Sequence, residues 1–197
     1  MIRVVFNQKG GVGKSSIATN LAAIGASRGV NTLLVDLDPQ CNSTQYLLGE
    51  DVTVVEQTIR DLFTHRGKVA VESFGFITQS PFENLDLIAA DANIADIQTK
   101  LESKHKIFKL REILQALEAV YDVIIIDTPP AYNFFTLSAL IAAERCLIPF
   151  DCDDFSRRAL YTLIDNLDET REDHNENLKL EGIVVNQFQA RANQPAR

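Results

Sequence analysis

The sequence is poor in cysteine and has no long hydrophobic run. Its 197 residues include three cysteines, Cys41, Cys146 and Cys152, whose spacing matches neither a metal site nor a disulfide framework. Reduced thiols in a cytoplasmic protein are therefore expected. No apolar stretch approaches the roughly 18 residues of a membrane span, and no signal peptide precedes the first hydrophobic segment. The sequence thus predicts a cytoplasmic chain without a stable membrane span.

Basic residues are outnumbered by acidic ones. The chain has 19 Lys and Arg against 27 Asp and Glu, a formal net charge of −8 at pH 7. Nucleic-acid-binding proteins usually carry a strong basic excess, so this charge balance argues against nucleic-acid binding. It leaves open a local basic patch that forms only in a dimer. The only dense basic stretch, residues 100–111, is expected to be a solvated helix face, with contact to a partner or to DNA as the alternative.

What the sequence does contain is a glycine-rich segment between a predicted strand, residues 2–6, and a predicted helix, residues 15–28. Glycines let backbone N–H groups surround phosphate oxygens, and the helix N-terminus adds its positive end. In this pattern the lysine meets the β- and γ-phosphates, and the hydroxyl after it ligates Mg²⁺. The predicted phosphate site comprises Gly10, Gly11, Val12, Gly13, Lys14, Ser15 and Ser16, with Ser15 also a metal ligand.

The segment departs from the general phosphate-binding pattern at one position. That pattern has a glycine where this chain has Gln8. Lys9 compensates for the difference, because the run from Lys9 to Ser15 is the deviant Walker A motif. A glycine-rich turn without chemical use is the alternative. The strand, loop and helix context favours the phosphate site.

Two further predicted strands end in carboxylates. Residues 32–36 and 121–127 are largely apolar, as in parallel strands buried on both faces, and they end at Asp36 and Asp127. Ligands of parallel α/β sheets bind beyond the carboxyl ends of the strands, so Asp36 and Asp38 are expected to face the nucleotide. Asp127 is expected to hold Mg²⁺ through water. The alternatives are a simple turn at Asp38 and a helix cap at Asp127.

These motifs resemble those of the ParA/MinD group of P-loop ATPases, and specifically the ParA partition ATPases. The resemblance covers nearly all of positions 1–190. It implies an α/β fold with a doubly wound, mostly parallel sheet flanked by helices, and a single P-loop ATPase domain over residues 1–197 that lacks the family's carboxyl-terminal strand and helices. The segments that carry it are Lys9-Gly10-Gly11-Val12-Gly13-Lys14-Ser15, Asp36-Leu37-Asp38-Pro39-Gln40 and Asp127-Thr128-Pro129-Pro130.

The resemblance also implies roles for single residues. Lys9 would reach across a nucleotide-sandwich dimer to the partner's phosphates, and Lys14 and Asp38 would complete the catalytic set, with Asp38 positioning the attacking water. Asp36 would support Mg²⁺ through water, and Asn186 would meet the adenine edge. The alternatives are a solvated lysine at a loop edge for Lys9 and a strand-to-loop turn for Asn186.

The implied function is a slow, Mg²⁺-dependent ATPase that uses ATP and releases ADP. In this family the ATP-bound homodimer binds DNA without sequence preference, and a ParB-like partner stimulates hydrolysis. Such a protein is cytoplasmic, joins the nucleoid when ATP-bound, and moves or positions a plasmid, a chromosome locus or a protein cargo. Arg191 falls in the carboxyl-terminal part where the family contacts DNA.

Three other classes stay open. A MinD-like regulator of division-site placement that cycles on the membrane would end in an amphipathic basic helix, and none is visible. A metabolic enzyme of the same fold would be an amidating ligase, which needs a further domain, or an iron–sulfur reductase, whose cysteine pattern Cys41 and Cys152 do not resemble. A nucleotide-binding fold without hydrolysis is the third, and the pair Asp36 and Asp38 argues against it.

Periodicity and capping residues predict the remaining elements. The helices are expected at 54–63 with Thr53 as cap, after Asp91, at 107–117, at 133–143 and at 155–171. The strands are expected at 85–89, at 145–150 with an end near Pro149, and at 181–185.

Overall fold

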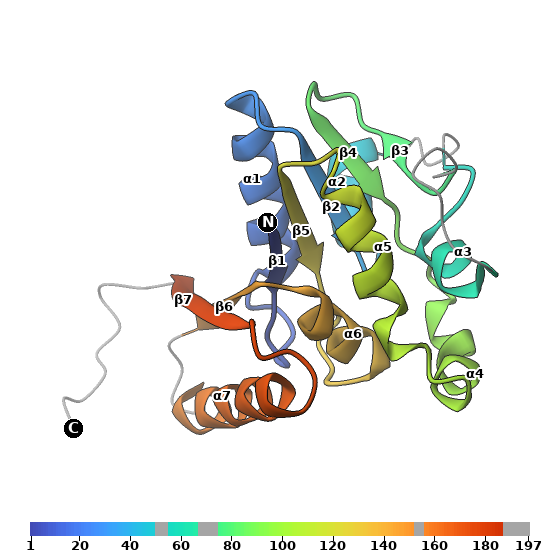
Figure 1. Ribbon diagram of the computed structural model, residues 1–197. Coiled ribbons are helices and arrows are strands. Elements are labelled where there is room, and N and C mark those ends of the chain that lie inside the picture. Colours follow the sequence, from blue (N-terminus) through green and yellow to red (C-terminus); the bar gives the residue numbers. More distant parts are fainter. Residues whose placement is uncertain (50–54, 67–74, 152–155, 187–197) are drawn as a thin grey trace.

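The computed structural model describes residues 1–49, 55–66, 75–151 and 156–186. In these residues, seven strands form one sheet in the order β3-β4-β2-β5-β1-β6-β7 (Figure 1). All neighbouring strands are parallel except β3 and β4, which are antiparallel. The strands are β1 (Ile2–Val5), β2 (Thr32–Asp36), β3 (Thr78–Gln79), β4 (Leu85–Ile88), β5 (Val123–Asp127), β6 (Arg145–Asp151) and β7 (Lys179–Asn186).

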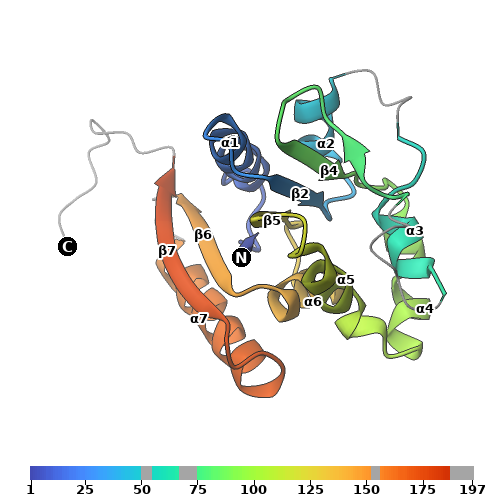
Figure 2. The same cartoon turned by 45° about the horizontal axis from the view of Figure 1, so that its top comes forward.

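Helices cover both faces of this sheet, which confirms the doubly wound α/β fold (Figure 2). α1 and α2 pack on one face, and α5, α6 and α7 pack on the other. The helices are α1 (Lys14–Ser27), α2 (Asn42–Leu48), α3 (Ile59–Thr64), α4 (Gln98–Ser103), α5 (Lys109–Leu117), α6 (Phe134–Ala142) and α7 (Ser156–Asp173), with 3₁₀ helices η3 (Ile94–Ile97) and η4 (Lys106–Phe108). None of them, in the described part of the chain, has the length and apolar character needed to cross a bilayer.

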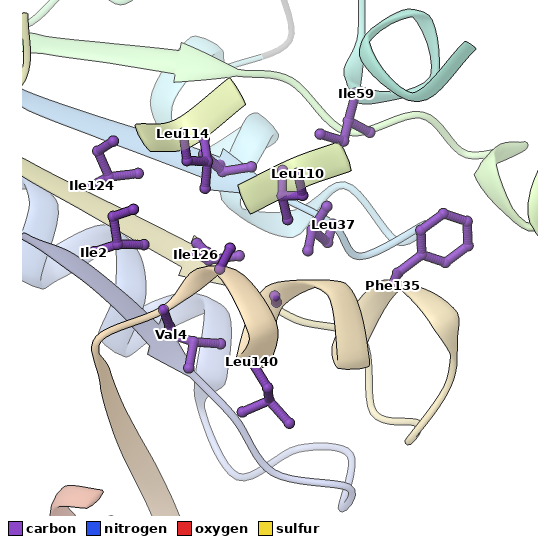
Figure 3. Packing of buried hydrophobic residues seen from close by; sticks show 14 of the residues in the cluster. Ile2, Val4, Leu37, Ile59, Leu110, Leu114, Ile124, Ile126, Phe135 and Leu140 are labelled. Atoms are coloured by element: carbon purple, nitrogen blue, oxygen red, sulfur yellow. The ribbon is translucent and has the colours of Figure 1, made fainter. Parts of the chain in front are cut away.

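The alternation of side chains along the central strands builds a core on each face. On β5, Ile124 and Ile126 join the larger cluster with α5 and α6 (Figure 3), whereas Ile125 packs in the smaller cluster with α1. The α1 side of that smaller cluster is Ala18, Ala22 and Ala26. Fully burying one large aliphatic side chain contributes roughly 1.5–3 kcal/mol. Packing on both faces therefore stabilises the sheet whose carboxyl edge carries the site.

The helix expected over residues 54–63 is shorter than predicted. α3 begins at Ile59 because Thr58 and Asp61 form a capping box, in which the Thr58 N–H donates to Asp61 Oδ2 at 2.8 Å. The expected cap, Thr53, lies outside the described residues. A local cap closer to the apolar run therefore sets the boundary. The side chains of Ile59, Leu62 and Phe63 are buried, as expected.

The strand expected to end near Pro149 continues to Asp151. β6 pairs with β1 only up to Leu147, whereas its pairing with β7 runs to Asp151. Pro149 therefore stands beyond the end of β1, where the N–H that proline lacks is not needed by a strand on that side. Its carbonyl accepts a hydrogen bond from the Asn7 side chain at 2.7 Å. The missing neighbour strand explains why the proline is tolerated.

Other departures from the sequence predictions are local. The helix after Asp91 is the 3₁₀ helix η3, whose N-cap is Asn93, and the Asp91 carboxylate accepts the Asn93 N–H at 2.8 Å. Helix α4 follows η3 directly, within the helical stretch expected after Asp91, whereas the short strand β3 was not predicted. The basic stretch 100–111 is not uniformly solvated, because Lys109 is buried and its Nζ donates to the carbonyl of His65.

β7 forms one edge of the sheet and is longer than the predicted 181–185. Its apolar side chains are exposed, with Ile183 41% and Val185 51% accessible. An apolar edge strand offers unpaired backbone groups to another segment. A further strand and helices beyond this edge stay a prediction. Cys152 and Arg191 lie outside the described residues.

Candidate functional site

The predicted site residues gather where β1, β2 and β5 end. Asp127 stands beside Asp36 on one side and Val5 on the other in the strand registers. The glycine-rich loop follows β1 and leads into α1. Gly10 lies close to the segment after β5, since a Cβ on Gly10 would sit 3.9 Å from the Cβ of Pro130. The fold thus brings the three motifs together at the carboxyl edge of the sheet.

Two glycines with positive φ shape the loop. Gly11 has φ +78° and Gly13 φ +91°, a region that other residues adopt only under strain. A Cβ on Gly13 would also lie only 2.4 Å from Nδ2 of Asn186. α1 starts at Lys14, and no side chain within the described ranges caps its N-terminus. Its first N–H groups are left for a ligand, which is the arrangement that binds phosphate.

Lys14 is folded back into this loop. Its Nζ donates to the Lys9 carbonyl at 2.9 Å, and the residue is only 6% exposed. Burial lowers the pKa of Lys14, while the carboxylates of Asp127 and Asp38 act in the opposite direction by favouring the charged form. The ammonium group and the carboxylates therefore share one confined space.

Asp36 and Asp127 form a pair of fully buried carboxyl groups. Burial, together with the charge of Asp127, raises the pKa of Asp36 to about 7. Burial likewise raises the pKa of Asp127 to about 6, although the hydroxyls of Ser15 and Ser43 act to lower it. Two unsolvated carboxylates that repel each other form a place where a cation is favoured.

Hydrogen bonds hold three of the four oxygens of this pair. Asp36 Oδ1 accepts the N–H of Asp38 at 3.0 Å, and its Oδ2 accepts the N–H and the hydroxyl of Thr44 at 2.9 and 2.8 Å. Asp127 Oδ2 accepts the Ser43 hydroxyl at 2.7 Å. Asp127 Oδ1 is buried and has no hydrogen-bond partner among the described residues. Such an acceptor calls for an ion or a water molecule.

The donor set at this edge fits Mg²⁺. The described residues contain no group of three or more His, Cys, Asp or Glu side chains that could hold a metal ion by themselves. Mg²⁺ at nucleotide sites uses one or two carboxylates together with water and phosphate oxygens, so a larger protein cage is not required. Asp127 Oδ1, which the described part of the chain leaves without a partner, matches that requirement, with Ser15 near it and Asp36 beside it.

Asp38 leaves β2 on a tight turn and is 5% exposed. Its Oδ1 accepts the N–H of Gln40 at 3.0 Å, so the turn considered as the simple alternative is present. The charge of this carboxylate acts to raise the pKa of both Lys14 and Asp127. The turn therefore directs Asp38 at the lysine and carboxylate cluster.

Comparison with known proteins establishes the family. A family model described as "AAA domain" matches residues 1–180. The chain is 36% identical over 190 residues to the chromosome partitioning protein ParA of Myxococcus xanthus, and 34% identical over 193 residues to the sporulation initiation inhibitor protein Soj of Bacillus subtilis. The chain belongs to this AAA domain family, among the ParA-type P-loop ATPases.

The alignments cover most of this ParA-type chain and part of its relatives. They include 96% of the chain and 65% of the Myxococcus protein, and 98% of the chain and 74% of Soj. A crystal structure described as cobyrinic acid a,c-diamide synthase from Mycobacterium smegmatis, with bound ATP analog and magnesium, has a TM-score of 0.86 and 27% identity. It covers 96% of this chain and 76% of that one, so a protein of the same fold holds nucleotide and magnesium.

Lys9, which is predicted to act across a dimer, contacts its own chain. Its Nζ forms an ion pair with Asp151 Oδ2 at 3.2 Å, at the end of β6. The Lys9 N–H donates to Asn7 Oδ1 at 2.8 Å, and the Asn7 amide in turn donates to the Pro149 carbonyl. Asn7 and Asp151 thus attach the start of the ParA loop to β6.

Asn186 lies at the end of β7 and reaches the same loop. Its Nδ2 donates to the Val12 carbonyl at 3.0 Å, and it lies over Gly13. Its role at the adenine edge stays a prediction. Ser16 is exposed on the first turn of α1, where its carbonyl accepts the Asn20 amide.

The side chains that hold these motifs in place carry no local sequence signal. The hydroxyls of Ser43 and Thr44, on the first turn of α2, belong to no sequence motif. Asn7 and Asp151 stand in segments predicted only as a loop start and a strand end. Only the register of β2 with β5, and of β1 with β6, brings these side chains to the site.

Proposed function

We propose that this chain is a Mg²⁺-dependent ATPase whose ATP-bound homodimer binds DNA without sequence preference and segregates or positions a cargo. The observation that carries the proposal is the buried Asp36 and Asp127 pair beside the N-terminus of α1. Among the described residues, one oxygen of the pair has no hydrogen-bond partner and no side chain caps that helix. Similarity to partition proteins supports a plasmid, chromosome locus or protein assembly as the cargo.

The nucleotide phosphates would bind to the amides of residues 10–16 and to Lys14. Lys14 would exchange the Lys9 carbonyl for phosphate oxygens, which form stronger, charge-assisted hydrogen bonds. Ser15 and Asp127 would hold Mg²⁺, with Asp36 acting through water. When bound, the ion supplies charge neutralisation at the β- and γ-phosphates.

Asp38 would orient the attacking water. Phosphoryl transfer depends mainly on positioning and charge stabilisation, so one well-directed carboxylate is sufficient for this task. The hydrogen bond from the Gln40 N–H to Asp38 Oδ1 supports the role because it fixes the direction of the side chain.

Lys9 would act on the nucleotide of the partner subunit in the ATP-bound dimer. It must first leave Asp151, with which it forms a partly exposed ion pair. Exposed ion pairs contribute only about 0–1 kcal/mol, so the exchange is inexpensive. Asn186 would likewise leave the Val12 carbonyl to meet the adenine edge.

DNA binding by a chain of net charge −8 requires a basic surface that the dimer assembles. Binding of this kind is electrostatic and weakens steeply with salt. A ParB-like partner would stimulate the slow hydrolysis, and the ATP-bound protein would be found on the nucleoid within the cytoplasm.

The test is binding of the Asp38→Ala variant to random-sequence duplex DNA in Mg-ATP and Mg-ADP at two salt concentrations. We expect salt-sensitive binding with ATP alone. The matched control is the double variant Lys9→Ala with Asp38→Ala, which should remain monomeric and leave the DNA free. Dimers that bind no DNA, or binding that is equal in ADP, would contradict the DNA part of the proposal.

One structural similarity favours a second candidate, an amide-forming ligase, because the Mycobacterium smegmatis protein is described as a diamide synthase. The partition relatives are more similar in sequence, at 36% and 34% identity against 27%. The two functions differ in what stimulates ATP turnover. A partition ATPase responds to DNA and its partner protein, whereas a ligase requires a carboxylic acid and an ammonia source.

A further inference from the structure

Ser43 joins three elements beneath the metal carboxylate. It is fully buried on α2, its hydroxyl donates to Asp127 Oδ2 on β5 at 2.7 Å, and it accepts the hydroxyl of Thr19 on α1 at 3.2 Å. A serine hydroxyl has one proton to donate. The other acceptor in reach, the Ser15 carbonyl, is 3.5 Å away and uncharged, so the proton goes to Asp127.

The next residue, Thr44, forms hydrogen bonds with the other buried carboxylate, Asp36. Thr44 donates its N–H and hydroxyl to Asp36 Oδ2, and its hydroxyl oxygen accepts the Ala90 N–H at 3.0 Å. The first turn of α2 thus holds both buried carboxyl groups. Because α2 follows directly on the turn that carries Asp38, that turn is connected to the same two groups.

We propose that Ser43 is a positioning residue for the metal carboxylate Asp127. By engaging Oδ2, it fixes the rotation of the carboxyl group and leaves Oδ1, which has no partner among the described residues, directed at the metal position. The inference rests on the proposed function, since it concerns the Mg²⁺ of that site. Outer partners of metal ligands typically contribute about 10–100-fold in metal affinity.

The experiment is a Mg²⁺ titration of the chain in the presence of a fluorescent ATP analogue. Ser43→Ala should raise the Mg²⁺ concentration at the midpoint by about 10-fold or more. Affinity for the analogue in EDTA should stay unchanged. Ser138→Ala is the matched control, because Ser138 is a buried serine on α6 whose hydroxyl has no partner among the described residues. It should leave the midpoint unchanged.

A second pair of variants tests the orientation of the Ser43 hydroxyl. Thr19→Val keeps the side-chain shape but removes the donor to Ser43, so the midpoint should move in the same direction by a smaller factor. Thr19→Ser keeps the donor and should match the parent. Thermal unfolding without ligand shows whether Ser43→Ala folds. If it does not, the two Thr19 variants test the inference instead.

The outcomes separate the inference from the function on which it rests. An unchanged midpoint in Ser43→Ala, or in Thr19→Val where the first variant does not fold, would overturn the inference. So would an equal loss of affinity in EDTA, because Ser43 would then hold the loop rather than the metal carboxylate. A parent chain whose nucleotide affinity does not depend on Mg²⁺ would contradict the proposed function itself, and the inference with it.

Discussion

Asp36 and Asp127 stand opposite each other on β2 and β5, and both side chains are fully buried. Their pKa values are raised to about 7 and about 6 because burial leaves the charged forms unsolvated. Such a pair destabilises the ligand-free fold at neutral pH. Ligand binding offsets that cost, because anything that binds the folded chain alone stabilises it.

The first prediction concerns stability against pH. The two folded-state pKa values lie above the ordinary value of about 4 for Asp, so the folded chain binds these protons more tightly than the unfolded chain. The resulting stability is fully present below about pH 4 and is lost as the pH rises through about 6–7. In EDTA without nucleotide, this pair should therefore lower the free energy of unfolding across that window.

Asp127→Asn isolates the contribution of the pair. The variant removes one buried charge, so at pH 8 the ligand-free chain should melt higher than the parent, by about 2–4 °C for each kcal/mol gained. At pH 5 the difference should shrink. Asp96→Asn, which changes an exposed carboxylate, is the control. A variant that melts lower than the parent at pH 8 would contradict the assigned repulsion.

A second prediction separates hydrolysis from binding. Asp38→Ala should bind ATP and dimerise, but its turnover should fall by about 10²–10⁴-fold, the usual contribution of a positioned acid or base group. Asp61→Ala, which alters a carboxylate at the α3 cap away from the loop, should hydrolyse ATP at the parent rate. The measurement is phosphate release at saturating ATP. Turnover at the parent rate in Asp38→Ala would exclude the catalytic role of Asp38.

A third prediction concerns the dimer. Lys9→Ala should keep ATP binding and lose ATP-dependent dimerisation, as measured by light scattering. Asp151→Asn should instead favour ATP-dependent dimerisation, because it removes one ion pair that holds Lys9 on its own chain. The pair is partly exposed, so the expected gain in dimer affinity is modest, at most about 5-fold. Normal dimerisation of Lys9→Ala would exclude the cross-dimer role.

A fourth prediction compares two glycines of the loop. Gly13→Ala introduces both an unfavourable φ and a contact with Asn186, whereas Gly11→Ala introduces only the unfavourable φ, with open space around it. A left-handed conformation costs a non-glycine residue roughly 1–2 kcal/mol. Gly13→Ala should therefore destabilise the chain more, and Asn186→Ala combined with it should recover the difference. Thermal melts of the three variants and the parent measure this.

The central strands and the phosphate loop could be predicted because local signals agree with the fold. The apolar run of β2 and its end at Asp36 were predicted with the observed bounds. The glycine positions matched the positive φ values at Gly11 and Gly13. The apolar composition of β2 predicts burial on both faces of the sheet. The glycines of the loop predict a turn in which a residue with a Cβ would be strained.

The remaining features depend on contacts that are distant in sequence. Pro149 indicated a strand end, but β6 continues to Asp151. The proline is tolerated there because β1 ends two residues earlier in the register and needs no N–H from it. Ser43 carries no motif, and its bond to Asp127 spans 84 positions. Lys109 belonged to a basic run, yet α5 buries it against the carbonyl of His65. Such features follow from topology rather than from local pattern.

The most direct test of the proposed site is calorimetric titration of ATP into the parent chain and into Asp127→Asn, each with Mg²⁺ and with EDTA. The account predicts that the parent binds ATP much more tightly with Mg²⁺, and that Asp127→Asn loses this difference while still binding ATP in EDTA. Equal affinity of the parent in the two conditions, or a Mg²⁺ dependence that the variant retains in full, would contradict it.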